Sequence, residues 1–206
     1  GVRVDALVSI QTADGKTAAK DRGELQITDY GISGIPVFQL SRVAARALSE
    51  QKKVYATLNF VPLWEKEQCL TYFKERFKKA DEKRIGEALI GFFPEKLIPV
   101  LLEESHIKAA KYANRLQTEE LERFIDTVQG LRVDITDWNT FDTAQVTAGG
   151  VDTDEIDAET MESKLCPGLY FAGEMVDIDG ICGGYNLQWA WSSGAVAGIH
   201  VARELS

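Results

Sequence analysis

The sequence predicts a mixed α+β protein, in which a β-rich domain carries a helical excursion and is followed by a strand–loop–helix segment. Three observations support this fold class. Apolar and polar residues alternate over residues 2–10, which is the period of a half-buried strand. Apolar residues then recur at helical spacing over residues 63–129. Finally, a short apolar run, a glycine-rich loop and a helical pattern follow one another over residues 168–203.

Further strands and the first helix are expected within the first 60 residues. Residues 24–28 and 54–60 are predicted to be strands. Between them, residues 31–34 are punctuated by two glycines and are expected to form a loop. Pro36 suits the first turn of a helix, because its fixed φ is already helical, and apolar residues repeat at helical spacing after it.

The helical block over residues 63–129 begins with an aromatic stripe whose opposite face carries Lys and Glu. The stripe consists of Trp64, Cys69, Tyr72, Phe73 and Phe77. A core face is the favoured interpretation, and the wall of a substrate pocket is the alternative. Thr118 is expected to cap a helix that Gly130 ends, and residues 131–136 return to β character.

Charge narrows the functional classes. The net charge is −9, and residues 134–206 carry 13 acidic side chains but only two basic ones. Because a nucleic-acid-binding protein needs a basic face, this balance argues against nucleic acid as a partner. The Lys- and Arg-rich residues 74–84 are the one exception. Since acids interrupt them, a solvated helix face is favoured over a binding surface.

The sequence also indicates the compartment. No apolar run approaches the ~18–20 residues of a membrane span, and no signal peptide is visible, so no membrane partner is expected. The three cysteines lie far apart, which fits a reducing, cytoplasmic compartment. With only two histidines, both interpreted as structural, no metal site is expected. The chain begins at Gly1 rather than Met, which suggests a processed or cut chain.

The last third of the sequence holds the candidate site. Residues 168–174 form an apolar run ending in an acid and are expected to be a buried strand. A glycine-rich loop over residues 175–185 follows, then Asn186 as an N-cap and a helix over residues 187–203. The unpaired amides of a helix N-terminus can hold an anion or a polarised carbonyl, and glycines let the backbone approach it. Turn geometry alone is the alternative explanation of the glycines.

Several stretches resemble one protein family. The most specific is Gly-Gly-Tyr-Asn-Leu-Gln-Trp-Ala over residues 183–190, which follows Gly-Leu-Tyr-Phe-Ala-Gly-Glu over residues 168–174. Thr-Ala-Gly-Gly-Val over residues 147–151 and Tyr-Gly-Ile-Ser-Gly over residues 30–34 agree as well. The sequence thus resembles the bacterial FAD-dependent flavoprotein oxidoreductases of the aminoacetone-oxidase-like and bile-acid-pathway-reductase-like kind.

The resemblance implies an FAD-dependent oxidoreductase that exchanges hydride or electrons between a small organic substrate and NAD(P)H or oxygen. It implies that Glu174, with Asp177 beside it, accepts hydrogen bonds near the ribityl or pyrophosphate region of FAD. It also implies that the amides at the start of the C-terminal helix face the flavin. It identifies no catalytic residue. The cofactor-binding residues that it implies are Gly173, Glu174, Asp177, Gly183, Gly184, Tyr185, Asn186 and Leu187.

Two further residues or segments keep alternative interpretations. Cys182 precedes the glycine pair and is interpreted as a packing residue rather than a redox-active one. Residues 31–34 are either a plain turn between a strand and a helix or a loop that closes over the flavin.

The resemblance also implies that the FAD domain is incomplete. Family members are longer and open with a strand, Gly-x-Gly-x-x-Gly and a helix, which this sequence lacks. Its organisation is expected to be a β-rich inserted domain over residues 1–60 and 131–148, a helical insertion over residues 61–130, and the closing segment of a Rossmann-like FAD domain over residues 149–206.

The N-terminal half of that FAD domain is the expected partner. Without it, the C-terminal helix should expose apolar surface or bury it in a homodimer. The alternative is a truncated, non-catalytic fragment or interaction module that binds no flavin by itself.

Overall fold

The structure, a computed structural model, describes residues 1–13, 15–140, 142, 144 and 146–204. These residues form five strands and the helices α1 to α6, so the mixed α+β class predicted from the sequence is confirmed. The chain divides into two compact units, which we call unit 1 (Gly1–Trp138) and unit 2 (Asn139–Ser206). No described helix is long and apolar enough to cross a membrane.

Unit 1 contains an antiparallel sheet with the strand order β3-β2-β1-β4-β5. The alternation over residues 2–10 is confirmed, because Ala6, Val8 and Ile10 are buried on one face of β1. The loop expected at residues 31–34 is partly strand, since Ile32–Gly34 pairs with the end of β2. The strands are β1 (Val2–Thr12), β2 (Thr17–Ile27), β3 (Ile32–Gly34), β4 (Val54–Asn59) and β5 (Leu131–Ile135).

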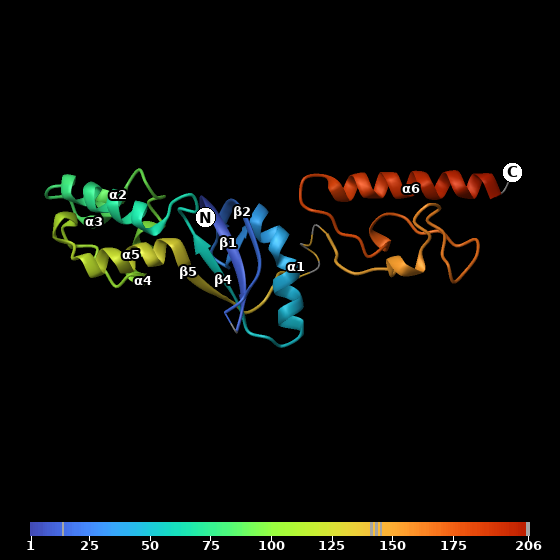
Figure 1. The fold of residues 1–206 in the computed structure, drawn as a ribbon, viewed down its shortest axis with the longest axis horizontal. Coiled ribbons are helices and arrows are strands. Elements are labelled where there is room, and N and C mark those ends of the chain that lie inside the picture. The colour runs from blue at the N-terminus through green and yellow to red at the C-terminus, as the bar shows by residue number, and fades with distance from the viewer. Residues whose placement is uncertain (14, 141, 143, 145, 205–206) are drawn as a thin grey trace. The chain divides into compact units, whose positions relative to one another are not determined.

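Helix α1 (Ile35–Ser49) packs against β1, β2 and β4 (Figure 1). Pro36 lies in its first turn, as expected from the sequence. The helix buries Pro36, Leu40, Ala44 and Ala47, whose spacing places them on one face. The two alanines let the helix approach the sheet closely.

The remaining helices of unit 1 form a region with an aromatic core. Phe73 and Phe124 are fully buried, with ring centroids 5.5 Å apart, and Phe77 is buried beside them. The core interpretation of the aromatic stripe is therefore confirmed for Phe73 and Phe77. Burial also raises the pKa of the Cys69 thiol, which keeps it protonated. The helices are α2 (Lys66–Lys79), α3 (Ile85–Leu89), α4 (Ile98–Glu104) and α5 (Thr118–Gly130).

The N-cap expected at Thr118 is wrong by one residue. Thr118 is the first residue of α5, and Gln117 precedes it as the cap. The carboxylate of Glu120 accepts a hydrogen bond from the Gln117 amide at 2.8 Å, which completes a capping box. Glu120 also pairs with Lys111 at 2.6 Å, so a tertiary contact helps to place the start of the helix.

Unit 2 has a smaller core than unit 1. Its buried apolar residues are Ile156, Met161, Val176 and Ala197, and partly buried aromatic residues pack against them. Helix α6 (Tyr185–Glu204) contacts the short 3-10 helix η4 (Gly173–Met175). Most of the described chain before α6 in unit 2 is loop, and backbone hydrogen bonds hold it over residues 151–178.

Candidate cofactor site

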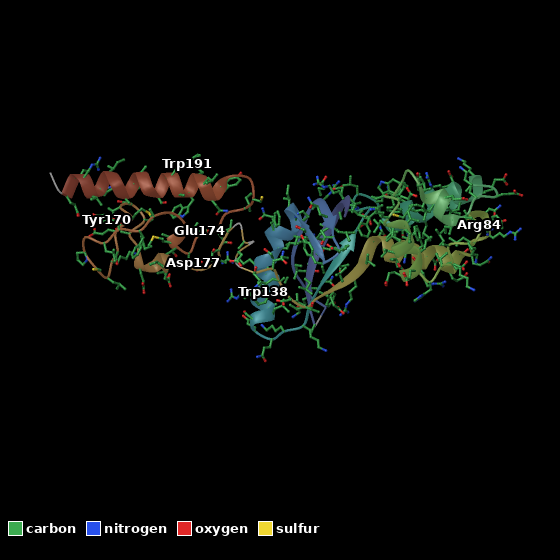
Figure 2. All side chains as sticks on the ribbon, turned by 180° about the vertical axis from the view of Figure 1, so that it is seen from behind. Arg84, Trp138, Tyr170, Glu174, Asp177 and Trp191 are labelled. Atoms are coloured by element: carbon green, nitrogen blue, oxygen red, sulfur yellow. The ribbon has the colours of Figure 1, made fainter. Side chains whose placement is uncertain are left out.

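The two acids of the candidate site hold a backbone loop of the same unit. Oε1 of Glu174 accepts a hydrogen bond from the Thr147 amide at 2.8 Å, and Oδ1 of Asp177 accepts one from the Gly149 amide at 3.1 Å. Figure 2 labels both side chains in unit 2, on the part of the chain that precedes α6. Both are exposed and keep further lone pairs, so their predicted contacts with cofactor hydroxyls stay a prediction.

The same loop is fixed by its own backbone. The Val151 amide donates to the Met175 carbonyl at 2.8 Å, and the Asp177 amide donates back to the Val151 carbonyl at 3.0 Å. Gly150 lies between these contacts with φ 156°, and a Cβ there would lie 2.6 Å from the Met175 carbonyl oxygen. Only glycine allows the two backbone segments to approach this closely.

Helix α6 holds the start of η4 through two polar side chains. Oγ of Ser193 accepts a hydrogen bond from the Gly173 amide at 2.9 Å and donates to the Trp189 carbonyl at 2.7 Å. The indole Nε1 of Trp189 donates to the Gly173 carbonyl at 3.0 Å. Sequence reasoning missed this role, although a Trp and a Ser four residues apart on one helix face were a usable signal.

The buried strand expected over residues 168–174 is wrong. Only a single antiparallel bridge, between Glu162 and Tyr170, forms there, and the run ends in η4. A buried parallel strand needs neighbouring strands on its sides, and the described part of unit 2 has no named strand to supply them. Tyr170 instead packs against the small core, where desolvation and the carboxylates of Glu204 and Glu162 raise its pKa to about 12.

The N-cap expected at Asn186 is also wrong. Helix α6 begins at Tyr185, which places Asn186 in its first turn. Its side chain accepts a hydrogen bond from the Gly180 amide at 2.7 Å and donates to the Gly180 carbonyl at 3.2 Å. Asn186 therefore fixes the glycine-rich loop to the helix instead of capping the helix amides.

The first turn of α6 leaves backbone donors available. Its first hydrogen bond runs from the Gln188 amide to the Gly184 carbonyl at 3.0 Å. Within the described residues, the amides of Tyr185, Asn186 and Leu187 donate to no backbone carbonyl outside the helix, as is usual for a helix start. These donors, with the helix dipole, suit a phosphate or a carbonyl group.

Gly183 and Gly184 directly precede these donors in the chain, and open space adjoins Gly184. Their φ angles are 121° and 93°, and a Cβ built on Gly184 meets no atom within 4 Å. A side chain there would fill the space from which a ligand can reach the backbone. The donors and the open space fit the edge of a flavin or a phosphate. Tyr185 and Leu187, also predicted as site residues, expose 58% and 60% of their surface.

The other candidate groups are placed as follows. Cys182 is exposed and not in a disulfide, so the structure gives it no packing role. Residues 32–34 form a strand that leads directly into α1, which agrees with a simple connection between a strand and a helix. Closure of this segment over a flavin stays a prediction. Among the described residues, no group of three or more His, Cys, Asp or Glu side chains could hold a metal ion.

Comparisons with known proteins match most of the chain. The family described as the HI0933-like protein Rossmann domain matches residues 11–200. A 3-dehydro-bile acid delta(4,6)-reductase of Clostridium scindens is 46% identical over 198 residues, which are 96% of this chain and 48% of that protein.

Two ribosomal RNA dihydrouridine synthases are more distant relatives. The Escherichia coli protein is 32% identical over 91% of this chain and 44% of its own length. The Haemophilus influenzae protein is 32% identical over 88% of this chain and 43% of its own length. The chain therefore spans about half the length of the curated relatives that it matches.

Proposed function

Because the chain belongs to the HI0933-like protein family, we propose that it is part of an FAD-dependent oxidoreductase. The observation that carries this proposal is the open backbone at Gly184, directly before the amides of α6 that donate to no backbone carbonyl outside the helix. When bound, FAD would supply hydride-transfer chemistry. The rest of the FAD domain is the proposed partner of this chain.

The residues of this chain would bind and orient the cofactor. The amides of Tyr185, Asn186 and Leu187 would donate hydrogen bonds to it. Glu174 and Asp177 would keep residues 147–151 in place and offer their remaining lone pairs to cofactor hydroxyls. Asn186 and Ser193 would act one step further away, by fixing the loop at Gly180 and the start of η4.

The relatives' names support reduction of a carbon–carbon double bond that is conjugated with a carbonyl group. A delta(4,6)-reductase of a 3-dehydro bile acid saturates such a bond in a steroid. Dihydrouridine differs from uridine by saturation of such a bond in the base. The net reaction adds a hydride and a proton across the bond and oxidises NAD(P)H to NAD(P)⁺. A small organic enone is the first candidate substrate, because the bile-acid relative has the higher identity.

Uridine in RNA is the second candidate substrate. It is favoured by the two RNA-modifying relatives, which match 91% and 88% of this chain. The acidic composition of residues 134–206 favours the small organic substrate instead. The two candidates share the same chemistry and therefore the same cofactor site.

Reconstitution tests the proposed function. The purified chain is mixed with the part of the Clostridium scindens relative that it does not cover, FAD is added, and unbound cofactor is removed. Flavin absorbance should stay with the mixture and be negligible with the chain alone. NAD(P)H oxidation is then compared between a 3-oxo-delta(4,6) bile acid and unmodified ribosomal RNA. A mixture that retains no flavin would favour the alternative of a non-catalytic interaction module.

A further inference from the structure

The helical region of unit 1 carries a concentration of basic side chains. Residues 74–84 and 108–115 together contain nine basic and three acidic residues, in a chain with net charge −9. Backbone hydrogen bonds join the two segments, from the Ile85 amide to the Lys111 carbonyl at 2.9 Å and from the Ala113 amide to the Lys83 carbonyl at 3.0 Å. The fold therefore brings two basic stretches of the sequence together.

The arginines of this region are positioned by neutral groups. The Arg84 guanidinium donates to the Ala110 carbonyl and lies 4.4 Å from the centroid of the Tyr112 ring. The Arg115 guanidinium lies 5.1 Å from the same ring. Within the described chain, Lys83, Arg84 and Arg115 form no ion pair with a carboxylate. The charges of Arg84 and Arg115 are thus held in place without being paired with a carboxylate.

Two of the nearby carboxylates are engaged, while Asp81 and Glu82 lie exposed in the same basic stretch. Glu120 pairs with Lys111 at 2.6 Å, and Glu87 accepts a hydrogen bond from the Arg84 backbone amide at 2.8 Å. Figure 2 shows Arg84 at the end of the helical region that is remote from the sheet. This end of unit 1 is therefore a cationic surface with an aromatic ring at its centre.

A cleft of about 420 Å³ adjoins this surface at Lys83. Its walls combine three cations with apolar groups and two acids. Arg76 is fixed there by hydrogen bonds to the Ala88 carbonyl at 2.7 Å and the Ile90 carbonyl at 3.0 Å, so its charge also stays available. The main lining residues are Tyr72, Arg76, Lys79, Lys83, Ile90 and the acids Glu75 and Glu87.

We propose that this cationic surface binds RNA. Lys83 and Arg115 would contact phosphates, and the flat guanidinium of Arg84 would offer a surface on which a base can stack. The cleft beside Lys83 can receive an unstacked nucleotide. The acidic excess of the chain lies in residues 134–206, whereas residues 1–133, which include this surface, carry 21 basic and 19 acidic side chains. The choice of RNA among polyanions rests on the second substrate of the proposed function.

The test measures binding without flavin chemistry, so it can fail or succeed independently of the oxidoreductase proposal. A fluorescently labelled RNA hairpin is titrated with the full chain at 50 and 200 mM salt, with anisotropy as the readout. Each phosphate contact contributes about a threefold loss of affinity over this fourfold salt change. The double variant Lys83→Gln/Arg115→Gln removes two such contacts. The factor by which its RNA affinity falls between 50 and 200 mM salt should therefore be about tenfold smaller than for the wild type. Its binding at 50 mM salt should also be weaker.

The matched control is Lys52→Gln/Lys53→Gln, which removes two exposed cations before β4. It should leave the salt dependence unchanged. Equal salt dependence of the double variant and the control would overturn the proposal. So would absence of RNA binding at 50 mM salt, including the case in which the chain binds vesicles containing phosphatidylserine instead. Circular dichroism of both variants checks that the helical region stays folded.

Discussion

Gly184 and Gly168 have similar backbone conformations but different expected roles. Their φ angles are 93° and 78°, and a Cβ on either meets no atom within 4 Å. We expect Gly184→Val to weaken FAD binding by about 100-fold in the reconstituted mixture, because the side chain blocks hydrogen bonds worth about 1.5–3 kcal/mol each. Gly168→Val introduces the same backbone strain away from α6 and should retain the cofactor. Equal losses in equilibrium dialysis would contradict the site.

Glu174 is expected to act partly through the loop that it holds. Glu174→Ala removes the acceptor of the Thr147 amide and should weaken FAD binding by about tenfold, which is less than the effect of Gly184→Val. Hydrogen exchange at the Thr147 amide should become faster in the same variant. Glu174→Gln keeps an acceptor oxygen and should restore slow exchange. Unchanged exchange in Glu174→Ala would show that the carboxylate does not hold the loop.

At the scale of elements, the junction of β3 and α1 depends on one glycine. Gly34 precedes α1 with φ 103°, and a Cβ there would lie 2.3 Å from the Glu24 carbonyl oxygen in β2. Gly34→Ala should lower the free energy of unfolding by about 3 kcal/mol, since it adds a backbone clash to the cost of the left-handed conformation. Gly91→Ala, at φ 83° with open space, should cost only about 1 kcal/mol. Urea unfolding measures both, and equal costs would contradict the clash.

The start of α5 should make stability depend on pH. The hydrogen bond from Lys111, followed by that from the Gln117 amide, lowers the pKa of Glu120 below its ordinary value of 4.5. A lowered pKa in the folded state stabilises the protein above the ordinary value and loses this effect as the pH falls through the folded value. At neutral pH, the free energy of unfolding of the wild type should therefore be about 2 kcal/mol higher than that of Glu120→Gln. The difference should vanish in acid.

The control for this prediction is Glu119→Gln, because Glu119 is exposed in the same helical turn. It should change stability by only a few tenths of a kcal/mol through the helix dipole. A constant difference between wild type and Glu120→Gln from neutral to acidic pH would refute the assigned cause.

Local patterns predicted the elements of unit 1 better than those of unit 2. The alternation over residues 2–10 and Pro36 in the first turn of α1 are local signals, and the structure confirms both. Residues 168–174 have the composition of a buried strand, but strand formation needs neighbours that composition does not specify. Asn186 was misplaced for a related reason, because its side chain binds Gly180 across the loop and the helix begins at Tyr185, two residues before the predicted start.

At the scale of the whole molecule, the two units differ in how much apolar surface they bury. The core of unit 1 includes fully buried side chains such as Phe73, Phe124 and Leu101, whereas the core of unit 2, among its described residues, centres on four. Unit 1 should therefore resist limited proteolysis, while unit 2 should be cleaved first. Addition of the uncovered part of the relative should protect unit 2. Mass spectrometry of the fragments identifies the cleavage sites, and early cleavage within α2–α5 would contradict this order.

Helix α6 exposes large apolar side chains along much of its length. Trp191 and Ile199 expose 66% and 52% of their surface, although soluble helices usually bury such residues on one face. We expect the chain to bind a hydrophobic dye at α6, and Trp191→Gln/Ile199→Gln to reduce the dye fluorescence. Ile35→Gln/Phe38→Gln removes comparably exposed side chains from α1 and should have a smaller effect, since they adjoin a larger core. The proposed partner would cover α6, so its addition should lower dye binding to the wild type but not to Trp191→Gln/Ile199→Gln. An equal decrease in both proteins would place the covered surface elsewhere.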